Sequence, residues 1–355
     1  MTFKNNDIVI IRPDDWHVHL REGQLLNTVI DHTAQIFGKC IAMPNLKYPI
    51  IKSVMAQDYK NNISSNSSFK DLKVFVPCFL TDEIELKDFL TGIKDNYFFG
   101  AKLYPLNATT NSSNGVNNLE KIFPALEILE KYNAPLLIHA EKGSASISIF
   151  DREKYFIDDE MQQILKRFQN LKIVIEHIST EYGANFVNES SSNLASTITL
   201  HHLLLTKKDV FNGDVNPHHF CMPVVKNEKD LIALRKFACS GNKKFFLGTD
   251  SAPHDVKDKE NLDNIKPGIY TSPIAIEMYA SIFEEENSLK NLEKFSSING
   301  SNFYNLPINN NKITLKKQEW INSKFTTYNK IKIKNFMGGQ KIKWKVLNTN
   351  KQKCI

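Results

Sequence analysis

Eight short apolar runs with few charges recur along the chain, and the segments between them are long enough for a helix. Runs of this kind are typical of parallel strands that are buried on both faces. In the intervening stretch 118–132, apolar residues repeat at helical spacing. Eight strand–helix alternations favour an α/β fold, a (β/α)8 or TIM barrel, over an open doubly wound sheet. The runs cover residues 14–20, 38–45, 72–80, 98–105, 134–141, 171–179, 196–204 and 244–253.

Two regions depart from this alternation. Residues 205–243 are long for one loop and one helix, and their apolar run 218–226 predicts added structure at one rim. Beyond Pro307 the chain is Lys-rich and alternates around a Gly-Gly turn, with Ile331 and Ile333 before it and Ile342, Trp344 and Val346 after it, which predicts a β-hairpin. We therefore expect a barrel over residues 1–306 and a hairpin-like C-terminal extension over 307–355 that packs on the barrel and is not an independent domain.

The composition narrows the class of protein. The 355 residues are 41% hydrophobic and carry a net charge of +6, a mild surplus without a basic stripe that would indicate nucleic-acid binding. No run approaches the roughly eighteen apolar residues of a membrane helix, and the first residues lack a signal-peptide pattern. The five cysteines are odd in number and widely spaced, which disfavours a disulfide framework. We expect a cytoplasmic protein with a small-molecule substrate, no nucleic-acid or membrane partner, and possible assembly as a homodimer.

Polar residues of ligand or acid–base type fall at the C-terminal ends of the predicted strands. Barrel enzymes place their active sites at this end, and polar groups left unpaired in a core would cost several kcal/mol each. Six different strands therefore direct such groups to one mouth. The seven residues concerned are His17, His19, Asn45, Lys102, His139, His177 and Asp250.

His17 and His19 are the clearest pair. Side chains alternate along a strand, so both should point into the barrel while Val18 points outward. An isolated pair of this kind is as often two hydrogen-bonded core histidines as a metal site, but the ligand-type residues on other strands favour metal. Imidazole and carboxylate ligands without thiolate suit zinc or another borderline divalent ion. His17 and His19 with Asp250 could hold one ion, and His139 with His177 a second, which would require a bridging anion.

Several residues allow two interpretations. Lys102 is either a structural lysine with its charge in water or a reactive lysine that carbon dioxide converts into a bridging carbamate. Asp250 is a metal ligand and general base, or a helix N-cap. Arg21 either grips a substrate carboxylate or makes a surface ion pair, and His254 is placed to reach the same anion. The small polar segment 107–115 after Lys102 is a mobile lid or an ordinary solvated loop.

At this point the motifs resemble a known family. RPDDWHVHLREG, AMPN, AKLYPLNATTNSSNGV, IHAE, FDREKYFI, EHIST and FLGTDSAPH occur in the order and at nearly the intervals found in the dihydroorotases of the amidohydrolase superfamily, in particular the shorter single-domain bacterial type. The resemblance extends from about residue 8 to 306, and more weakly to the end. It implies the reversible cyclisation of N-carbamoyl-L-aspartate to L-dihydroorotate, with release of water, in pyrimidine (UMP) synthesis.

The resemblance also implies roles for individual residues. His17, His19 and Asp250 would hold one zinc ion and His139 and His177 the other, bridged by N6-carboxylated Lys102 and a hydroxide. Asp250 would be the catalytic acid/base. Substrate contacts would come from Arg21, Asn45, Thr109, Thr110, Met222, His254 and Ser272.

The chain departs from the family pattern in two places. Met222 stands where many members have leucine, although a backbone contact should tolerate the change. The stretch 257–275 lacks a cysteine-rich insert seen in some members, and Ser272 replaces their alanine. Two other functions remain open: a hydantoinase or allantoinase with the same metal set, and a metal-free homologue acting as a structural partner. The first would not need the anion grip of Arg21, and the second would show gaps in the ligand set, whereas all six ligand positions are filled.

Overall fold

The computed structural model describes residues 1–4 and 7–347, and it contains all eight predicted barrel strands. Each strand is short, and the third is interrupted, so that it is divided into two pieces. The strands are β3 (Asp15–Val18), β4 (Lys39–Ala42), β5 (Lys73–Phe75), β6 (Cys78–Phe79), β7 (Ala101–Leu103), β8 (Leu136–Ile138), β9 (Ile173–Ile175), β10 (Leu194–Ile198) and β11 (Phe245–Leu247).

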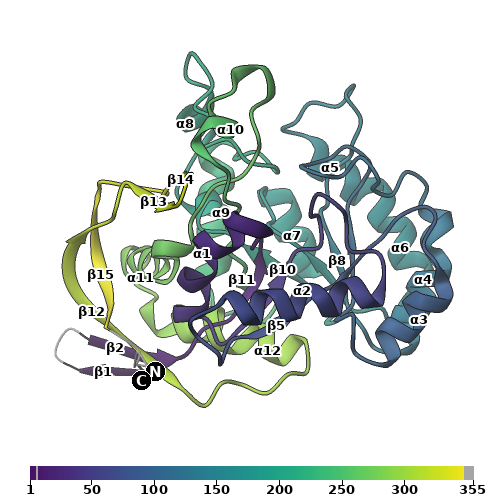
Figure 1. Cartoon of the computed structure of the whole chain (residues 1–355), viewed down its shortest axis with the longest axis horizontal. Coiled ribbons are helices and arrows are strands. Elements are labelled where there is room, and N and C mark those ends of the chain that lie inside the picture. Colours follow the sequence, from purple (N-terminus) through teal and green to yellow (C-terminus); the bar gives the residue numbers. More distant parts are fainter. Residues whose placement is uncertain (5–6, 348–355) are drawn as a thin grey trace.

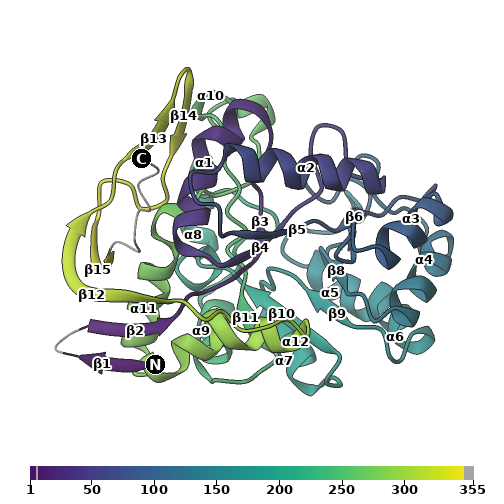
Figure 2. The ribbon, with the colours of Figure 1, turned by 60° about the horizontal axis from the view of Figure 1, so that its bottom comes forward.

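The barrel closes at two places where the ladder is weak. Strands β6 to β11 pair in parallel in chain order, and β3, β4 and β5 form a second parallel set. The two pieces of the interrupted third strand join these sets, because β5 pairs with β4 and β6 pairs with β7. On the other side Val18 bridges Ser251, and Thr249 donates to Asp15 Oδ2 at 2.6 Å. Figure 2 shows β3, β4 and β5 running together through the middle of the molecule.

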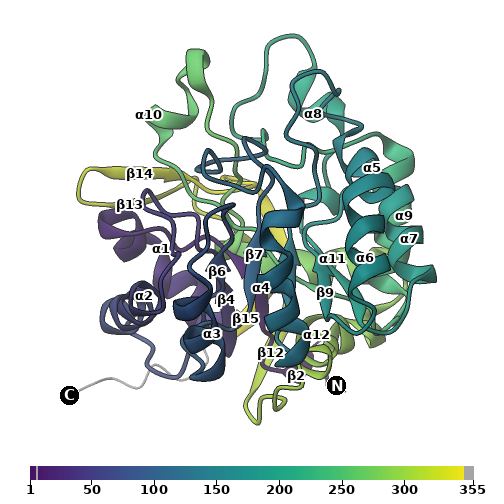
Figure 3. The ribbon, with the colours of Figure 1, turned by 90° about the vertical axis from the view of Figure 1, so that its right-hand side faces the viewer.

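The helices cover the outside of the strands. Figure 3 shows α3 and α4 in front of the strands, with α6, α7 and α9 to the right. The predicted helix 118–132 is α4, which begins where the side chain of Asn118 accepts a hydrogen bond from Glu120 N. The helices are α1 (Gly23–Ile36), α2 (Ser53–Asn66), α3 (Leu86–Lys94), α4 (Leu119–Lys131), α5 (Arg152–Phe156), α6 (Gln162–Arg167), α7 (Glu181–Glu189), α8 (Lys207–Phe211), α9 (Glu228–Cys239), α10 (Val256–Lys259), α11 (Ala275–Glu285) and α12 (Asn299–Phe303).

Two local expectations need correction. The seventh predicted strand, 196–204, is strand only as far as Ile198, and a short 3-10 helix, η2 (His201–Leu203), follows it. The rim segment does add structure, since α8 precedes a long loop and α9 follows it, but its apolar run 218–226 belongs to no strand. Residues 221 and 223–226 of that run are buried, and Met222 lines the barrel mouth.

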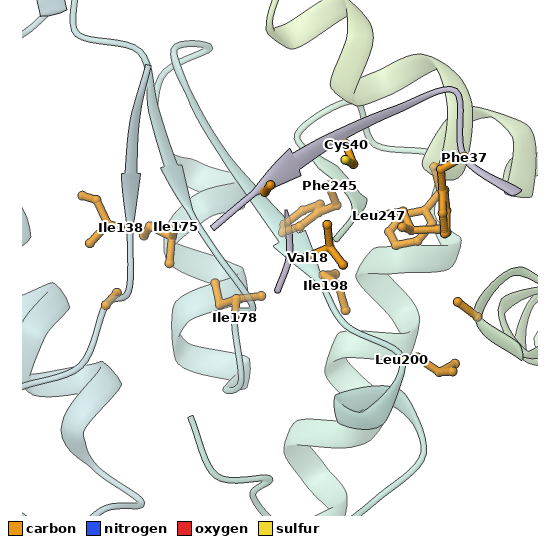
Figure 4. Close-up of a cluster of buried hydrophobic side chains, with 14 of the residues drawn as sticks. Val18, Phe37, Cys40, Ile138, Ile175, Ile178, Ile198, Leu200, Phe245 and Leu247 are labelled. Carbon is orange, nitrogen blue, oxygen red and sulfur yellow. The ribbon is translucent and has the colours of Figure 1, made fainter. Parts of the chain in front are cut away.

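The alternation of side chains divides the core into two layers. Outward residues such as Val18, Ile138, Ile175, Ile198 and Phe245 pack against the helices in one large cluster, part of which Figure 4 shows. Val18 therefore points outward, as predicted. A smaller cluster fills the floor of the barrel, and it consists of Trp16, Ile41, Met43, Leu137, Val174, Ala195, Phe246 and Tyr304. Polar side chains are consequently placed one step higher, at the carboxyl ends of the strands.

The C-terminal extension is β-structure, but its pairing differs from the predicted hairpin. β14 (Ile331–Lys334) pairs with β13 (Phe325–Tyr328), whereas β15 (Lys341–Leu347) pairs with β12 (Lys312–Ile321). The segments on the two sides of the Gly-Gly turn thus belong to different sheets. The physical reason is that each already has another antiparallel partner within the extension.

β12 also pairs with the start of the chain. The four-stranded sheet has the order β1-β2-β12-β15, with β1 (Thr2–Lys4) and β2 (Asp7–Ile11), and Figure 1 shows its yellow C-terminal strands beside the purple N-terminal ones. The sheet packs on α11, where Val346 N donates to Glu277 at 3.3 Å. Because this sheet uses residues from both ends of the chain, a division after residue 306 stays a prediction, and residues 348–355 of the extension lie outside the described part.

The four cysteines in the described residues are buried and free, and Cys354 lies outside those residues. Over residues 1–4 and 7–347, none of the helices combines the length and apolar character needed to cross a membrane.

Candidate metal centre and substrate cleft

The ends of three neighbouring strands raise polar side chains directly above the apolar floor. On β7, β8 and β9 the inward positions are Lys102, then Leu137 followed by His139, and Val174 followed by Glu176. Lys102, His139 and Glu176 are all at most 1% exposed. Buried charges persist only where they are paired or bind a ligand, so this layer indicates a site.

His17, His19 and Asp250 converge as predicted. The Nε2 atoms of His17 and His19 are 3.3 Å apart, and Asp250 Oδ1 lies 3.2 Å from the first and 3.0 Å from the second. Gly248 makes room for this cluster, because a Cβ atom there would lie 2.8 Å from Thr197 Cβ and 3.1 Å from the Cβ of His17. Two imidazole nitrogens and one carboxylate oxygen that face a common point form a typical divalent-cation donor set.

The second pair of histidines lies beside the first. His139 Nδ1 is 3.1 Å from His177 Nε2, and the rings of His17 and His177 have centroids 5.0 Å apart. The other nitrogen of His139 lies 3.0 Å from Glu141 Oε2, a carboxylate that can orient the ring and fix its tautomer. Glu141 thus supports the site, although its sequence motif gave it no role.

Glu176 is the residue that sequence reasoning missed. Its Oε2 accepts a hydrogen bond from the Lys102 ammonium, and its Oε1 lies 3.0 Å from His17 Nδ1. Strand alternation by itself would point only one of the adjacent residues Glu176 and His177 inward. Both reach the site because His177 leaves the strand geometry, with a φ of 44°. A carboxylate directly before a predicted ligand at a strand end was the available signal.

Backbone strain concentrates at the mouth. Arg21, His177 and Asp250 have φ values of 62°, 44° and 45°, in the left-handed region that costs an ordinary residue about 1–3 kcal/mol. Arg21 therefore does not reach the site as the next inward residue of a continuous strand, as alternation suggested. It reaches the cleft from a turn after β3. Strain of this kind is common where a structure holds functional groups in fixed positions.

Burial and neighbouring charges separate the protonation states of the four imidazoles. Burial alone would lower the pKa of His17, but the carboxylates of Glu176 and Asp250 outweigh it and raise that pKa to about 9. Burial lowers the pKa of His19 to about 4 and also lowers the pKa of His139 and of His177. Burial lowers the pKa of Lys102 as well, although Glu176 opposes the shift. The imidazoles of His19, His139 and His177 are therefore held neutral, and the neutral form is the one that donates a lone pair to a metal.

A small cleft opens beside the His17–His19–Asp250 cluster. Arg21 is on its wall, with Nε donating to Pro253 O at 3.2 Å and Nη2 lying 3.0 Å from His254 Nε2. Both contacts fix the guanidinium on the wall of the cleft that Asp250 also lines. The residues that line the cleft are His19, Arg21, Asn45, Thr109, Thr110, Met222, Asp250, Ala252, Pro267 and Gly268.

The loop after β7 forms the cover of this cleft. Asn45 Nδ2 donates to Thr110 O at 3.1 Å, and Asn111 Nδ2 donates to Asn45 O at 3.0 Å. Within the loop Thr109 N donates to Ser112 Oγ at 2.9 Å. The buried oxygens Asn45 Oδ1 and Thr110 Oγ1 have no hydrogen-bond partner in the described residues. These two oxygens are therefore available to a ligand in the cleft.

Ser272 is the predicted substrate residue that the structure places elsewhere. It is 2% exposed, its amide donates to Ser251 Oγ at 3.0 Å, and it is absent from the cleft lining formed by the described residues. Pro267 and Gly268 take that part of the rim, because the segment after α10 folds over the cleft before it reaches Ser272. Met222, in contrast, lines the cleft.

Lys259 is a second residue that sequence reasoning missed. It is 4% exposed, and its Nζ donates to the carbonyl oxygens of Phe220, Lys266 and Gly268 at 3.0, 2.8 and 2.8 Å. Burial lowers its pKa to about 7. One ammonium thus joins two loops that form the cleft wall.

Comparison with known proteins places this site in a family. An amidohydrolase family model matches residues 69–340. The chain belongs to the amidohydrolase family. Among the relatives of this amidohydrolase, the dihydroorotase of Hahella chejuensis is 42% identical over 96% of the chain and 99% of that protein. The dihydroorotase of Methylobacillus flagellatus is 44% identical over 88% of the chain and 91% of that protein.

Solved structures agree with the fold of this amidohydrolase. Dihydroorotase from Saccharomyces cerevisiae, in complex with 5-fluoroorotic acid, is 31% identical with a TM-score of 0.90 and covers 96% of this chain and 98% of its own. Dihydroorotase from Campylobacter jejuni is 32% identical with a TM-score of 0.88, over 98% of this chain and 99% of its own. An L-hydantoinase from Arthrobacter aurescens has a TM-score of 0.80 at 14% identity over 95% of this chain and 82% of its own, which shows only a shared fold. The family and the barrel fold are those predicted from the motifs.

Proposed function

We propose that this amidohydrolase is a dihydroorotase that interconverts N-carbamoyl-L-aspartate and L-dihydroorotate. The observation that carries the proposal is one cleft in which Arg21 lies beside His19 and Asp250. A fixed guanidinium calls for an anionic substrate, whereas neutral hydantoins offer it no carboxylate. L-Dihydroorotate carries a carboxylate next to a cyclic amide, as this cleft requires. Two solved relatives of the chain are dihydroorotases by name.

The donor set fits two divalent ions. His17, His19 and Asp250 would hold one zinc ion, and His139 and His177 the second, with carboxylated Lys102 between them. Imidazole nitrogens of these pairs face one another at 3.1 to 3.3 Å, an arrangement that a cation would stabilise. When bound, such ions supply Lewis-acid polarisation of the amide carbonyl and a lower pKa for the attacking water.

Carboxylation of Lys102 would change its partner. The neutral amine attacks carbon dioxide, an N–C bond forms, and one N–H proton leaves, so that the ammonium contact to Glu176 is replaced by two adjacent anionic groups. Two cations would neutralise that pair. Burial supports this step because it favours the neutral amine.

The remaining residues bind and orient the substrate and move its protons. Arg21, Asn45 and His254 would hold the carboxylate, which keeps the amide carbon above the histidine cluster. Asp250 would take a proton from the attacking water and return it to the leaving amide nitrogen. Thr109 and Thr110 would close over the bound ring and exclude solvent. We also propose a cytoplasmic location and assembly as a homodimer.

The proposal is tested by following dihydroorotate hydrolysis by the purified protein, with dihydrouracil and hydantoin as neutral comparison substrates. We expect activity on dihydroorotate alone, abolished by chelation, restored by zinc, and absent in Lys102→Ala. Equal turnover of a neutral ring would favour a hydantoinase. Full activity after verified metal removal, or in Lys102→Ala, would contradict the two-metal mechanism. Deletion of Thr109 and Thr110 should lower turnover while metal content stays constant.

A further inference from the structure

A second cluster of ligand-type side chains lies behind the cleft wall and takes no part in the proposed reaction. His201 and His202 belong to η2, directly after β10, and Cys221 belongs to the rim loop one residue before Met222. One donor atom from each of the three lies within 4.8 Å of those of the others. The three side chains are at most 2% exposed, and the two imidazole rings have centroids 4.7 Å apart.

His201 is left without any polar partner. Both of its ring nitrogens are buried and lack a hydrogen bond to any residue in 1–4 or 7–347. A buried polar atom in this condition costs about 1–3 kcal/mol, so an imidazole with two such atoms is unfavourable unless something else binds it. Imidazole is the commonest metal ligand among protein side chains, so a cation bound at one of these nitrogens would supply a partner that the ring lacks.

His202 and Cys221 point to the same place. His202 Nε2 lies 3.1 Å from Pro223 O, and Cys221 Sγ lies 3.2 Å from the same oxygen. On the other side of its ring, His202 Nδ1 is 2.6 Å from Thr199 Oγ1. If Nδ1 carries the proton and donates to Thr199, Nε2 presents its lone pair beside the sulfur. Metal-bound histidines are commonly held in this way by a second hydrogen bond.

We propose that His201, His202 and Cys221 form a separate binding site for a divalent cation of borderline softness, such as zinc. Two imidazole nitrogens and one thiolate suit zinc, and Pro223 O is the nearest available fourth donor. On binding, the Cys221 S–H bond breaks, a sulfur–metal bond forms and the proton leaves to solvent. The proton on His202 moves from Nε2 to Nδ1. No redox step is involved.

Such an ion would act structurally. It would fix the loop that carries Cys221 to the end of β10, and Met222 on that loop lines the cleft. The site differs in chemistry from the His17–His19–Asp250 cluster, whose proposed ligands are imidazoles and oxygens only. That difference allows the two kinds of site to be distinguished in one sample.

The test loads the chelated full-length protein with cobalt(II) and records metal stoichiometry and the near-ultraviolet sulfur-to-cobalt charge-transfer band. We expect three equivalents of cobalt per chain and a clear sulfur band. His201→Gln and Cys221→Ser should each lose one equivalent and the band. The matched control is Cys239→Ser, a buried cysteine outside both His-containing clusters of the described residues, made with Cys354→Ser to remove the undescribed thiol.

Each result decides the proposal. The control should keep both the band and all three equivalents. Absence of the band in the parent protein, or a band that survives both site variants, would overturn it. His201→Gln leaves the thiol in place, so it remains informative if Cys221→Ser fails to fold. A cobalt-loaded parent protein that shows the band but has no dihydroorotase activity would count against the proposed function. It would leave the proposal of this third site intact, because the band comes only from a thiolate.

Discussion

The mouth of the barrel and the sheet formed by the two chain ends differ in how far their buried polar groups have hydrogen-bond partners. At the mouth, Nδ1 of His19 and Nδ1 of His177 are buried without a hydrogen-bond partner in the described residues. In the sheet, the buried face of β12 and β15 is apolar, and the Trp344 indole donates to Glu284 at 3.2 Å. Several unpaired groups gather at the mouth, where a ligand can complete them, whereas in the described residues of the sheet Asp7 Oδ1 alone is buried without a partner.

Among the variants that distinguish the mouth from the sheet, Asp250→Asn should have the largest effect, and the effect should be on activity. The amide keeps the size of the carboxylate but cannot accept and return a proton, so kcat should fall by about 10²–10⁴-fold. The melting temperature should change far less than the activity. Steady-state dihydroorotate hydrolysis and thermal unfolding of the same preparation check this. A variant with near-normal kcat would exclude Asp250 as the acid/base.

The opposite result is expected for Trp344→Ala in the sheet. Removing a large side chain that is 2% exposed should lower the free energy of unfolding by about 3–5 kcal/mol, while kcat of the folded protein stays unchanged. The control is Lys345→Ala on the exposed face of the same strand, which should shift stability by no more than about 0.5 kcal/mol. Denaturant unfolding provides both values. A stable Trp344→Ala variant would show that the sheet contributes little to the fold.

The two regions also differ in how far the sequence could predict them. The site residues at the mouth lie at or just after the ends of individual strands, so the apolar runs placed His17, His19, Lys102, His139 and Asp250 at one end of a barrel. The sheet depends on pairing between Ile10 and Ile313, from opposite ends of the chain. No local pattern records such a partner, and the alternation around Gly338 and Gly339 was therefore read as one hairpin.

Within the mouth, the errors arose where the backbone leaves regular strand geometry. Glu176 was missed because the φ of His177 lets two consecutive residues face inward. Lys259 was missed because its partners are backbone carbonyls on other loops, which have no sequence signature. Ser272 was assigned to the cleft by family position, and the path of the preceding segment buries it instead.

Glu277 tests the sheet contact through pH. Burial raises its pKa to about 7 from an ordinary 4.5, so between these values the folded state binds more protons than the unfolded state. The stability that it contributes is complete below pH 4.5 and is lost as the pH rises through about 7, by up to about 3 kcal/mol. Glu277→Gln should remove this slope and be the more stable protein at pH 8. Chemical unfolding from pH 4.5 to 8 measures the difference, and parallel profiles would contradict it.

The smallest expected effect returns to the cleft wall. Lys259→Met keeps the length of the side chain but removes three hydrogen bonds that join the loops bearing Phe220 and Gly268. A hydrogen bond to a charged group contributes roughly 1.5–3 kcal/mol to stability, and part of this free energy maintains the shape of the cleft. Loss of these bonds should therefore raise KM for dihydroorotate by about tenfold. Because Lys259 does not touch the reacting atoms, kcat should change little. Lys257→Met, on the exposed side of α10, is the matched control. A fall in kcat at constant KM would mean that Lys259 acts on the chemical step and not on the shape of the cleft.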